Sequence, residues 1–179
     1  LAFLRVRGPP RPALVPAATR FRAAISACEK GGQWERALSL LEEMKTRGPA
    51  PDVISFSAAI SACEKGAQCD AALALLAEMA EYGVSPNVVT FSAAIAACET
   101  GGAWERALAL LDDMGARAIA PNVISFNSAI AACGKAGEWE RALALLDEMR
   151  ARGLAPDAIS FNGAISACAS ADECDRVLE

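Results

Sequence analysis

The chain repeats one pattern every 35 residues along most of its length. Starting at Val53, Val88 and Val123 it reads VISFSAAISACEKG, VVTFSAAIAACETG and VISFNSAIAACGKA, and each stretch is followed by a segment of the type WERALALLDEM. The same apolar residue types recur 35 positions apart: Phe21, Phe56, Phe91, Phe126 and Phe161; Ile25, Ile60, Ile95, Ile130 and Ile165; Met44, Met79, Met114 and Met149. A strict period of this size predicts a solenoid, in which each unit buries its apolar face only against its neighbours. Any function should then lie along a surface that the repeat copies.

The apolar spacing inside one unit predicts two helices. Over residues 53–65 the apolar positions fall four and three apart, which marks one face of a helix, at Phe56, Ile60 and Cys63. Gly66 interrupts this run, and a second helix is expected over about 69–82. Gly83 suits the position just after its end. We therefore expect an all-α fold, a right-handed α-solenoid of antiparallel helix pairs.

This register divides the chain into five units and a leading segment. The leading segment is 1–17, rich in Arg and Pro, and is either a linker-like arm or the remnant of a degenerate repeat. The units are 18–52, which is atypical, then 53–87, 88–122 and 123–157, with a partial unit at 158–179. Because finished solenoids usually end in polar capping units and neither end here has one, we expect the chain to be part of a longer array.

Charge and hydropathy restrict the partners. The net charge is −5, but residues 1–22 carry five Arg and no acidic residue, so the remainder has 12 basic and 22 acidic residues, a net of −10. An acidic body argues against a nucleic-acid partner unless the basic residues gather on one face. The longest charge-free run, 118–134, is interrupted by Pro121, Asn122 and Asn127, so no membrane span is expected.

The cysteine pattern favours core packing over metal binding. Five of the seven cysteines recur at one place in each unit, on the apolar stripe, at Cys28, Cys63, Cys98, Cys133 and Cys168. Cys69 and Cys174 occupy the position that holds Trp34, Trp104 and Trp139 in other units. No CxxC pair and no His occurs, so we expect free core cysteines in a reducing compartment and no metal. Without His or a glycine-rich phosphate loop, neither an enzyme nor a cofactor is expected.

The repeat resembles the pentatricopeptide repeat family, to which VISFSAAISACEKG, the ALALL-EM segment and the closing GxxPD or GxxPN are similar. This resemblance implies single-stranded RNA as the partner, with one base read per repeat by two or three side chains. It also implies a monomer in a mitochondrion or chloroplast, with a role in RNA processing, stability or translation. The segment 1–17 could then be the tail of a transit peptide, although no clear targeting peptide is present.

The resemblance also implies roles for residues at fixed places in each unit. Base reading falls on the fifth and last residues: Ser57 with Asn87, Ser92 with Asn122, Asn127 with Asp157, and Asn162 alone. Base stacking falls on the second residue: Ile54, Val89, Ile124 and Ile159. Phosphate contact falls on position thirteen: Lys30, Lys65 and Lys135.

In the family, Ser or Thr with Asn favours adenine and Asn with Asp favours uracil, so the implied central readout is A-A-U, written 5′ to 3′. The first unit carries Arg22 at the fifth place and Asp52 at the last, a departure from the family pattern, and we assign it no base. The fifth unit, with Asn162, implies a pyrimidine.

Two other interpretations of these residues stay open. The last residues of the units are also favoured N-caps of the next helix. Helix geometry places positions two, five, nine and thirteen on one stripe, so the fifth residues should face a groove away from the core. Acidic pairs such as Asp112–Asp113 belong to second helices, which would leave this groove mildly basic.

The alternative function is a helical-repeat scaffold that binds protein partners, or a module that directs an enzymatic domain elsewhere in a longer chain.

Overall fold

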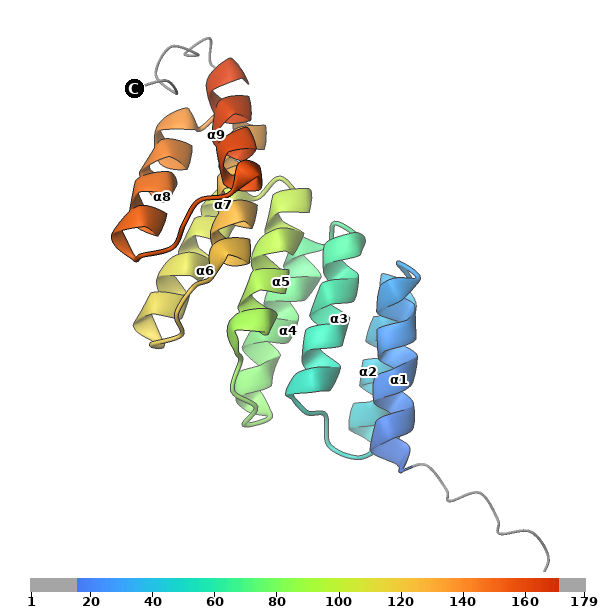
Figure 1. Cartoon of the computed structure of the whole chain (residues 1–179). Coiled ribbons are helices and arrows are strands. Elements are labelled where there is room, and N and C mark those ends of the chain that lie inside the picture. Colours follow the sequence, from blue (N-terminus) through green and yellow to red (C-terminus); the bar gives the residue numbers. More distant parts are fainter. Residues whose placement is uncertain (1–15, 171–179) are drawn as a thin grey trace, which may run out of the picture.

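The structure, a computed structural model, describes residues 16–170, and over this range it is entirely helical (Figure 1). The helices are α1 (Ala17–Lys30), α2 (Trp34–Arg47), α3 (Val53–Lys65), α4 (Cys69–Glu81), α5 (Val88–Thr100), α6 (Trp104–Ala116), α7 (Val123–Ala136), α8 (Trp139–Ala151) and α9 (Ala158–Ser170). The predicted α-solenoid of helix pairs is confirmed. The interpretation of segment 1–15 and the expected second helix of the last unit, with Cys174, lie outside the described residues.

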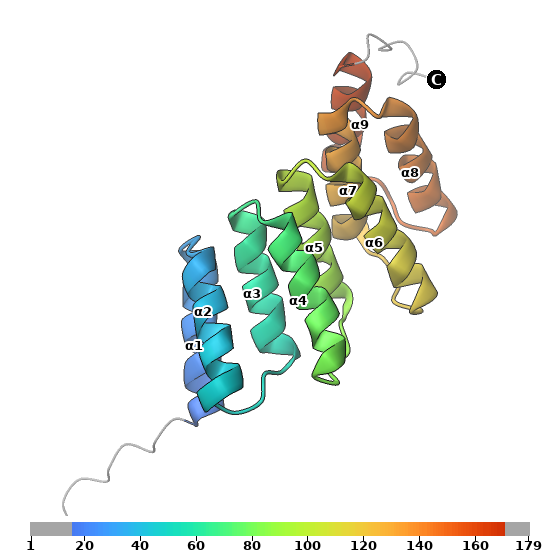
Figure 2. The same cartoon turned by 180° about the vertical axis from the view of Figure 1, so that it is seen from behind.

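The helices form two layers. Each odd-numbered helix packs against the next odd-numbered helix, so α1, α3, α5, α7 and α9 make a continuous row (Figure 1). Each even-numbered helix packs on its own odd partner and on the first helix of the next unit, and this layer faces the viewer at α4 and α6 in Figure 2. Successive units therefore share one core, and the surface of the odd row repeats the same side chains at regular intervals.

The repeated apolar residues build that core. The largest fully buried side chains include Phe56, Phe91 and Phe126 of the first helices, together with Ile25, Ile60, Ile95, Ile130, Met44, Met79, Met114 and Met149. Burying one such side chain stabilises the fold by roughly 1.5–3 kcal/mol. Trp34, Trp104 and Trp139 are partly buried and pack against the same cluster from its edge. Within the described residues, no helix is both long enough and apolar enough to cross a bilayer.

The turn positions show where two units depart from the repeat. After the first helices, Gly32, Gly102 and Gly137 have positive φ, and the equivalent residue of the second unit is Ala67, with φ of 54°. After the second helices, Gly83 and Gly153 have positive φ, and Ala118 takes that place with φ of 56°. Left-handed backbone costs an L-residue with a Cβ atom roughly 1–2 kcal/mol, so these two alanines are local weak points.

One cysteine expectation is wrong. Cys69 and Cys98 form a disulfide that joins the start of α4 to the end of α5, with Cα atoms 4.6 Å apart. In the first unit the corresponding Trp34 ring fills the space above Gly66. A cysteine at that position leaves room, and its sulfur reaches Cys98 of the next unit. The cysteines Cys28, Cys63 and Cys133 are free and buried, Cys168 is buried, and burial raises the pKa of Cys63 to about 11.

Exchanging glycine and alanine at these turns should change stability in opposite directions. We expect Ala67→Gly and Ala118→Gly each to raise the free energy of unfolding by about 1 kcal/mol, because glycine adopts positive φ without steric cost. Gly83→Ala and Gly102→Ala should lower it by a similar amount, although a Cβ atom at either site meets nothing within 4 Å. Urea unfolding followed by circular dichroism measures all four; a loss of stability in Ala67→Gly would contradict this account.

The cross-link should contribute to stability only under oxidising conditions. Because it closes a loop of 29 residues, we expect Cys69→Ser to lower the free energy of unfolding by about 3 kcal/mol relative to the oxidised protein. With a thiol reductant present, most of this difference should disappear. Cys63→Ser is the control, since its cost arises from packing and should be the same with and without reductant. An equal cost for Cys69→Ser in both conditions would show that the bond does not stabilise the fold.

Candidate functional site

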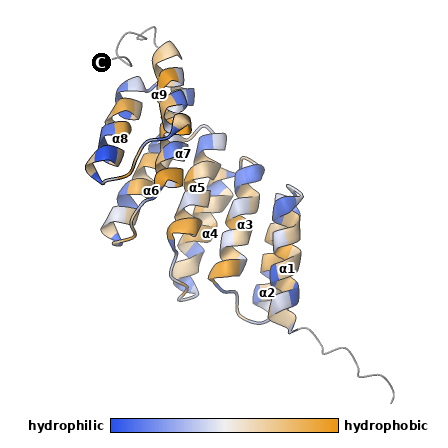
Figure 3. Ribbon diagram, in the orientation of Figure 1, coloured by the Kyte–Doolittle hydropathy of each residue, from blue (hydrophilic) through white to orange (hydrophobic). Residues whose placement is uncertain are grey.

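A row of exposed aliphatic side chains runs along the odd helices. The second residue of each of four units is Ile54, Val89, Ile124 or Ile159, and each is 55–63% exposed. The first turns of α3, α5 and α7, where these residues lie, are among the most apolar parts of the row in Figure 3. Large apolar side chains repeated on an exposed surface are informative, because core packing does not account for them.

The last residue of each unit caps the next first helix. Asn87 and Asn122 form reciprocal capping boxes with Thr90 and Ser125. Asp52 and Asp157 accept backbone N–H bonds in the same way from Ser55 and Ser160. The capping interpretation is confirmed. Base reading by these residues stays a prediction and is compatible with capping, because a cap uses only part of the hydrogen-bonding capacity of the side chain.

The fifth residues of the second, third and fourth units belong to the same hydrogen-bond network. The side chain of each reaches the Ser or Thr three places after the cap, in the next unit: Ser57 to Thr90 at 3.0 Å, Ser92 to Ser125 at 2.9 Å, and Asn127 to Ser160 at 2.5 Å. Asn127 also donates from Nδ2 to Oδ1 of Asp157 at 3.0 Å, and Ser92 donates to Oδ1 of Asn122 at 3.5 Å. The fifth and last residues of one unit, 30 positions apart, are thereby brought together.

This network buries two side chains that we expected to face the groove freely. Ser92 is 7% exposed and Asn127 is 9% exposed, because each lies between neighbouring first helices. Ser57 is half-buried and Asn162 is exposed. The expectation of an open polar edge is therefore wrong for Ser92 and Asn127. A ligand can reach their polar atoms only by exchanging the hydrogen bonds that they make in this structure.

The last residues keep atoms that the caps do not use. Within residues 16–170, Asn87 and Asn122 use Oδ1, and their Nδ2 amide groups take no partner. Asp157 uses Oδ1 for its hydrogen bonds within the same range, so Oδ2 remains available. Two units thus present a hydrogen-bond donor and the next presents an acceptor, at equivalent places along the row.

A cleft joins these residues at the second unit. It has a volume of about 330 Å³ and lies between the first helices of the first three units. Its lining includes the exposed aliphatic residues Ile54 and Val89 and the polar residues Ser57, Ser61 and Asn87. This size is at the lower end of the range for small-ligand sites, roughly 300–1,000 Å³. The cleft can hold a flat ring between two aliphatic side chains with polar groups at its edge.

The charges along the row are more balanced than we expected. Lys30 and Lys65 form no ion pair with any described residue, whereas Lys135 donates to the Glu99 carboxylate at 3.0 Å. Beside these lysines, Glu29, Glu64 and Glu99 recur at position twelve. Burial raises the pKa of Glu64, Lys65 lowers it, and the charges of Glu99 and Glu29 raise it further. The groove therefore carries acidic residues of its own, and the expectation of a mildly basic face is wrong.

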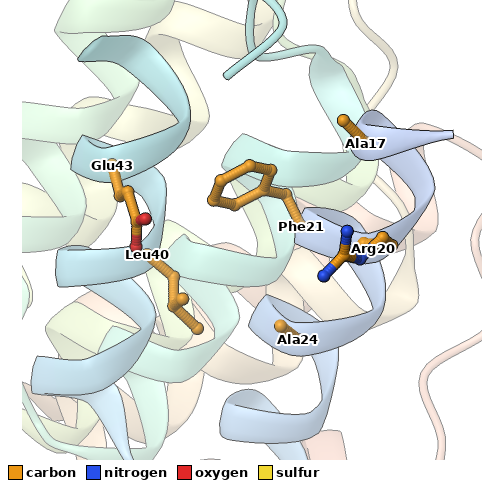
Figure 4. A pocket seen from close by; sticks show the side chains of 6 residues that line it. All are labelled: Ala17, Arg20, Phe21, Ala24, Leu40 and Glu43. Carbon is orange, nitrogen blue, oxygen red and sulfur yellow. The ribbon is translucent and has the colours of Figure 1, made fainter. Parts of the chain in front are cut away.

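A larger cavity lies outside this row. It has a volume of about 520 Å³ between α1 and α2, and Figure 4 shows Phe21, Leu40 and Glu43 around it. In the second unit the equivalent Phe56 lies under Lys45, which belongs to the preceding unit. Within residues 16–170 no helix precedes α1, so no described residue of a preceding unit contacts Phe21 in this way. This cavity lies on the face of the first unit that, in the second unit, contacts the preceding unit.

Sequence reasoning missed the residues that connect the network. They are the third residues of the first helices, and each is fully buried: Ser55, Thr90, Ser125 and Ser160. The sequence did contain the signal of a capping box, since each of these residues stands in the first turn of a helix, three places after an Asp or Asn. We considered only the exposed stripe, and these side chains lie beneath it.

Comparison with known proteins identifies the family. The PPR repeat family matches residues 121–170, the pentatricopeptide repeat domain matches 39–101, and the single PPR repeat matches 21–49 and 89–118. The chain belongs to the pentatricopeptide repeat family. No curated protein is similar enough to count as a match.

Solved pentatricopeptide repeat structures have the same fold. PPR10, described from maize, is 32% identical in its complex with an 18-nucleotide psaJ RNA element, with a TM-score of 0.78. That match covers 95% of this chain and 24% of the PPR10 chain. The PPR domain of protein-only RNase P 1 from Arabidopsis thaliana, in complex with tRNA, is 18% identical with a TM-score of 0.76. It covers 90% of this chain and 87% of that one, and at this identity the likeness concerns the fold.

Removing the charge of Glu64 should stabilise the protein at neutral pH. A raised pKa means that the folded state favours the protonated Glu64 carboxyl. The contribution of Glu64 to stability is therefore fully present below its pKa in the unfolded chain, about 4.5, and is lost as the pH rises through its pKa in the folded protein. We expect Glu64→Gln to raise Tm at pH 7 and the difference to shrink toward pH 4. Thermal melts at both pH values test this, with the exposed Glu105→Gln as control; a lower Tm at pH 7 would contradict it.

Proposed function

We propose that the odd-helix row binds single-stranded RNA, one base to a unit, through the second, fifth and last residues of each unit. The observation that carries the proposal is the cleft that Ile54 and Val89 line together with Ser57 and Asn87. A base can lie between the two aliphatic side chains, with its edge toward the polar pair. Its support from outside the chain is the fold shared with PPR10, which is 32% identical and was solved with RNA.

The unused atoms of the last residues account for the choice of base. The middle of the Watson–Crick edge is an acceptor, N1, in adenine and an N–H donor, N3–H, in uracil. Asn87 and Asn122 offer a free Nδ2 donor, which suits adenine, and Asp157 offers a free carboxylate oxygen, which suits uracil. The A-A-U preference implied by the family resemblance thus agrees with the chemistry of these three side chains.

Affinity of this chain alone should be low. Stacking of a base on an aromatic ring is worth about 1–3 kcal/mol, and an aliphatic sandwich should lie near the lower limit. Three units would then supply about 4 kcal/mol, near a millimolar Kd. Lys30 and Lys65 would hold phosphates, whereas Lys135 must first leave Glu99. We further propose, from family membership, that the protein takes part in organellar RNA processing, stability or translation.

A protein-interaction scaffold is the second candidate. Acidic side chains beside the aliphatic row would attract a basic, amphipathic peptide, and they would repel a phosphate backbone; they are Glu29, Glu64 and Glu99. Salt distinguishes the two functions, because neutralising phosphates releases counterions and gives affinity a steep dependence on salt concentration. A basic peptide should show a shallower one, because only its few ion pairs to these glutamates are screened by salt and its contacts with Ile54 and Val89 are not.

Exchanging one reading pair should change one base preference. We expect Ser57→Asn combined with Asn87→Asp to move the preference of the second unit from adenine to uracil, by about tenfold, because the free donor becomes an acceptor. NMR titration of the labelled chain at low salt with A-A-U and U-A-U oligonucleotides measures the change.

The matched control is Ser61→Asn, a half-buried serine on the same helix and in the same cleft, outside the reading pair. It should leave the adenine preference as it is. The proposed reading mechanism fails if the double variant keeps the preference for adenine while still folded and still binding.

A further inference from the structure

An ion pair takes the reading positions of the first unit. Arg22 stands at the fifth place and Asp52 at the last, and Nη1 of Arg22 lies 3.3 Å from Oδ2 of Asp52. In the fourth unit the residues at the same two places, Asn127 and Asp157, also meet, through Oδ1 of Asp157 at 3.0 Å. The fifth and last residues are therefore brought together in the first unit as well, although its residue types differ from those of the other units.

Both members of the pair are held in place from behind. Nε of Arg22 donates to the Ala18 carbonyl at 3.3 Å, within α1. Oδ1 of Asp52 accepts from the backbone N–H and the hydroxyl of Ser55, at 3.0 and 2.7 Å. Partial burial would raise the pKa of Asp52, but the Ser55 hydrogen bonds and the Arg22 charge outweigh it and lower the pKa. The carboxylate is thus ionised at neutral pH.

The pair is also accessible. The Arg22 side chain is 34% exposed and that of Asp52 is 42% exposed, in contrast to the buried Ser92 and Asn127. A guanidinium group has five N–H donors, and Ala18 and Asp52 take one each, so donors remain for a ligand. Ile54, the proposed stacking residue two places after Asp52, is exposed as well.

We propose that the first unit selects guanine, with Arg22 donating to O6 and N7 and the remaining acceptor site on Oδ2 of Asp52 accepting from N1–H. This proposal rests on the RNA-binding function proposed above. Arginine pairs with guanine O6 and N7 through its planar fork, and a carboxylate accepts from base amino and imino groups. The Hoogsteen edge of guanine, with O6 and N7, meets its Watson–Crick edge at O6. A residue at each edge would therefore lie next to the other, as Arg22 and Asp52 do.

The other bases match only part of the pair. Adenine presents an amino donor where guanine presents O6, which would oppose the Arg22 guanidinium. Cytosine presents an acceptor, N3, to the Asp52 carboxylate. Uracil offers N3–H and O4 but has no second acceptor equivalent to N7, so it leaves the fork half used. Guanine alone satisfies the donor and the acceptor together.

The test varies one base in front of the central triplet. The 179-residue chain, labelled with ¹⁵N, is titrated at low salt with four oligonucleotides X-A-A-U, in which X is G, A, C or U. We expect X = G to bind roughly tenfold more tightly than the others. We also expect the Arg22 Nε–H signal to shift with G and to move little with A or C.

Two variants separate the fork from the charge. Arg22→Lys keeps the positive charge and removes the fork, so it should abolish the guanine preference and retain most of the affinity. Asp52→Asn keeps a good N-cap and removes the carboxylate acceptor, so it should weaken guanine more than the other three bases. Circular dichroism confirms that both variants are folded.

The outcomes distinguish this proposal from the one on which it rests. Equal binding of all four X bases, while changes in A-A-U still weaken binding, overturns guanine selection alone. A uniform loss with all four oligonucleotides in Arg22→Lys also overturns it, since that result marks a contribution of Arg22 that is the same for every base. If changes in A-A-U have no effect either, the RNA-reading function itself fails and guanine selection fails with it.

Discussion

The hydrogen bonds between consecutive first helices set the geometry of the whole array. In three of the four described junctions an Asn or Asp caps a helix, the Ser or Thr in its first turn completes the cap, and the fifth residue of the preceding unit bonds to that Ser or Thr. Because the middle member is fully buried, losing its partners would leave a polar group without hydrogen bonds in the interior. The network therefore fixes how one unit lies against the next, beyond what apolar packing specifies.

The same network relates stability to function. The side chains that join the units are those at which the family resemblance places base reading, so a bound base would compete with contacts that hold the array together. Ser92 and Asn127 illustrate this, since both are almost fully buried. The last residues offer a way around the competition, because Asn87, Asn122 and Asp157 each keep one atom that capping does not use. Recognition through these atoms leaves the junctions intact.

Departures from the repeat mark the places where this chain differs from a regular array. Ala67 and Ala118 stand where the units on either side have glycine at positive φ. Cys69 replaces a tryptophan and bonds to Cys98, which links the second and third units covalently. Arg22 replaces a small polar residue and forms an ion pair. Each departure changes local chemistry without changing the fold, because the apolar residues that define the core are kept.

The 35-residue period by itself determined the all-α solenoid, the helix pairs and the exposed aliphatic row, because helical spacing dictates which residues share a face. It also placed the caps, since Asp and Asn before a helix start act locally. Burial of Ser92 and Asn127, the Cys69–Cys98 bond and the acidic row around Glu64 were decided by the tertiary structure. All three depend on how closely neighbouring units approach, and that distance is a property of packed side chains which a one-dimensional spacing does not contain.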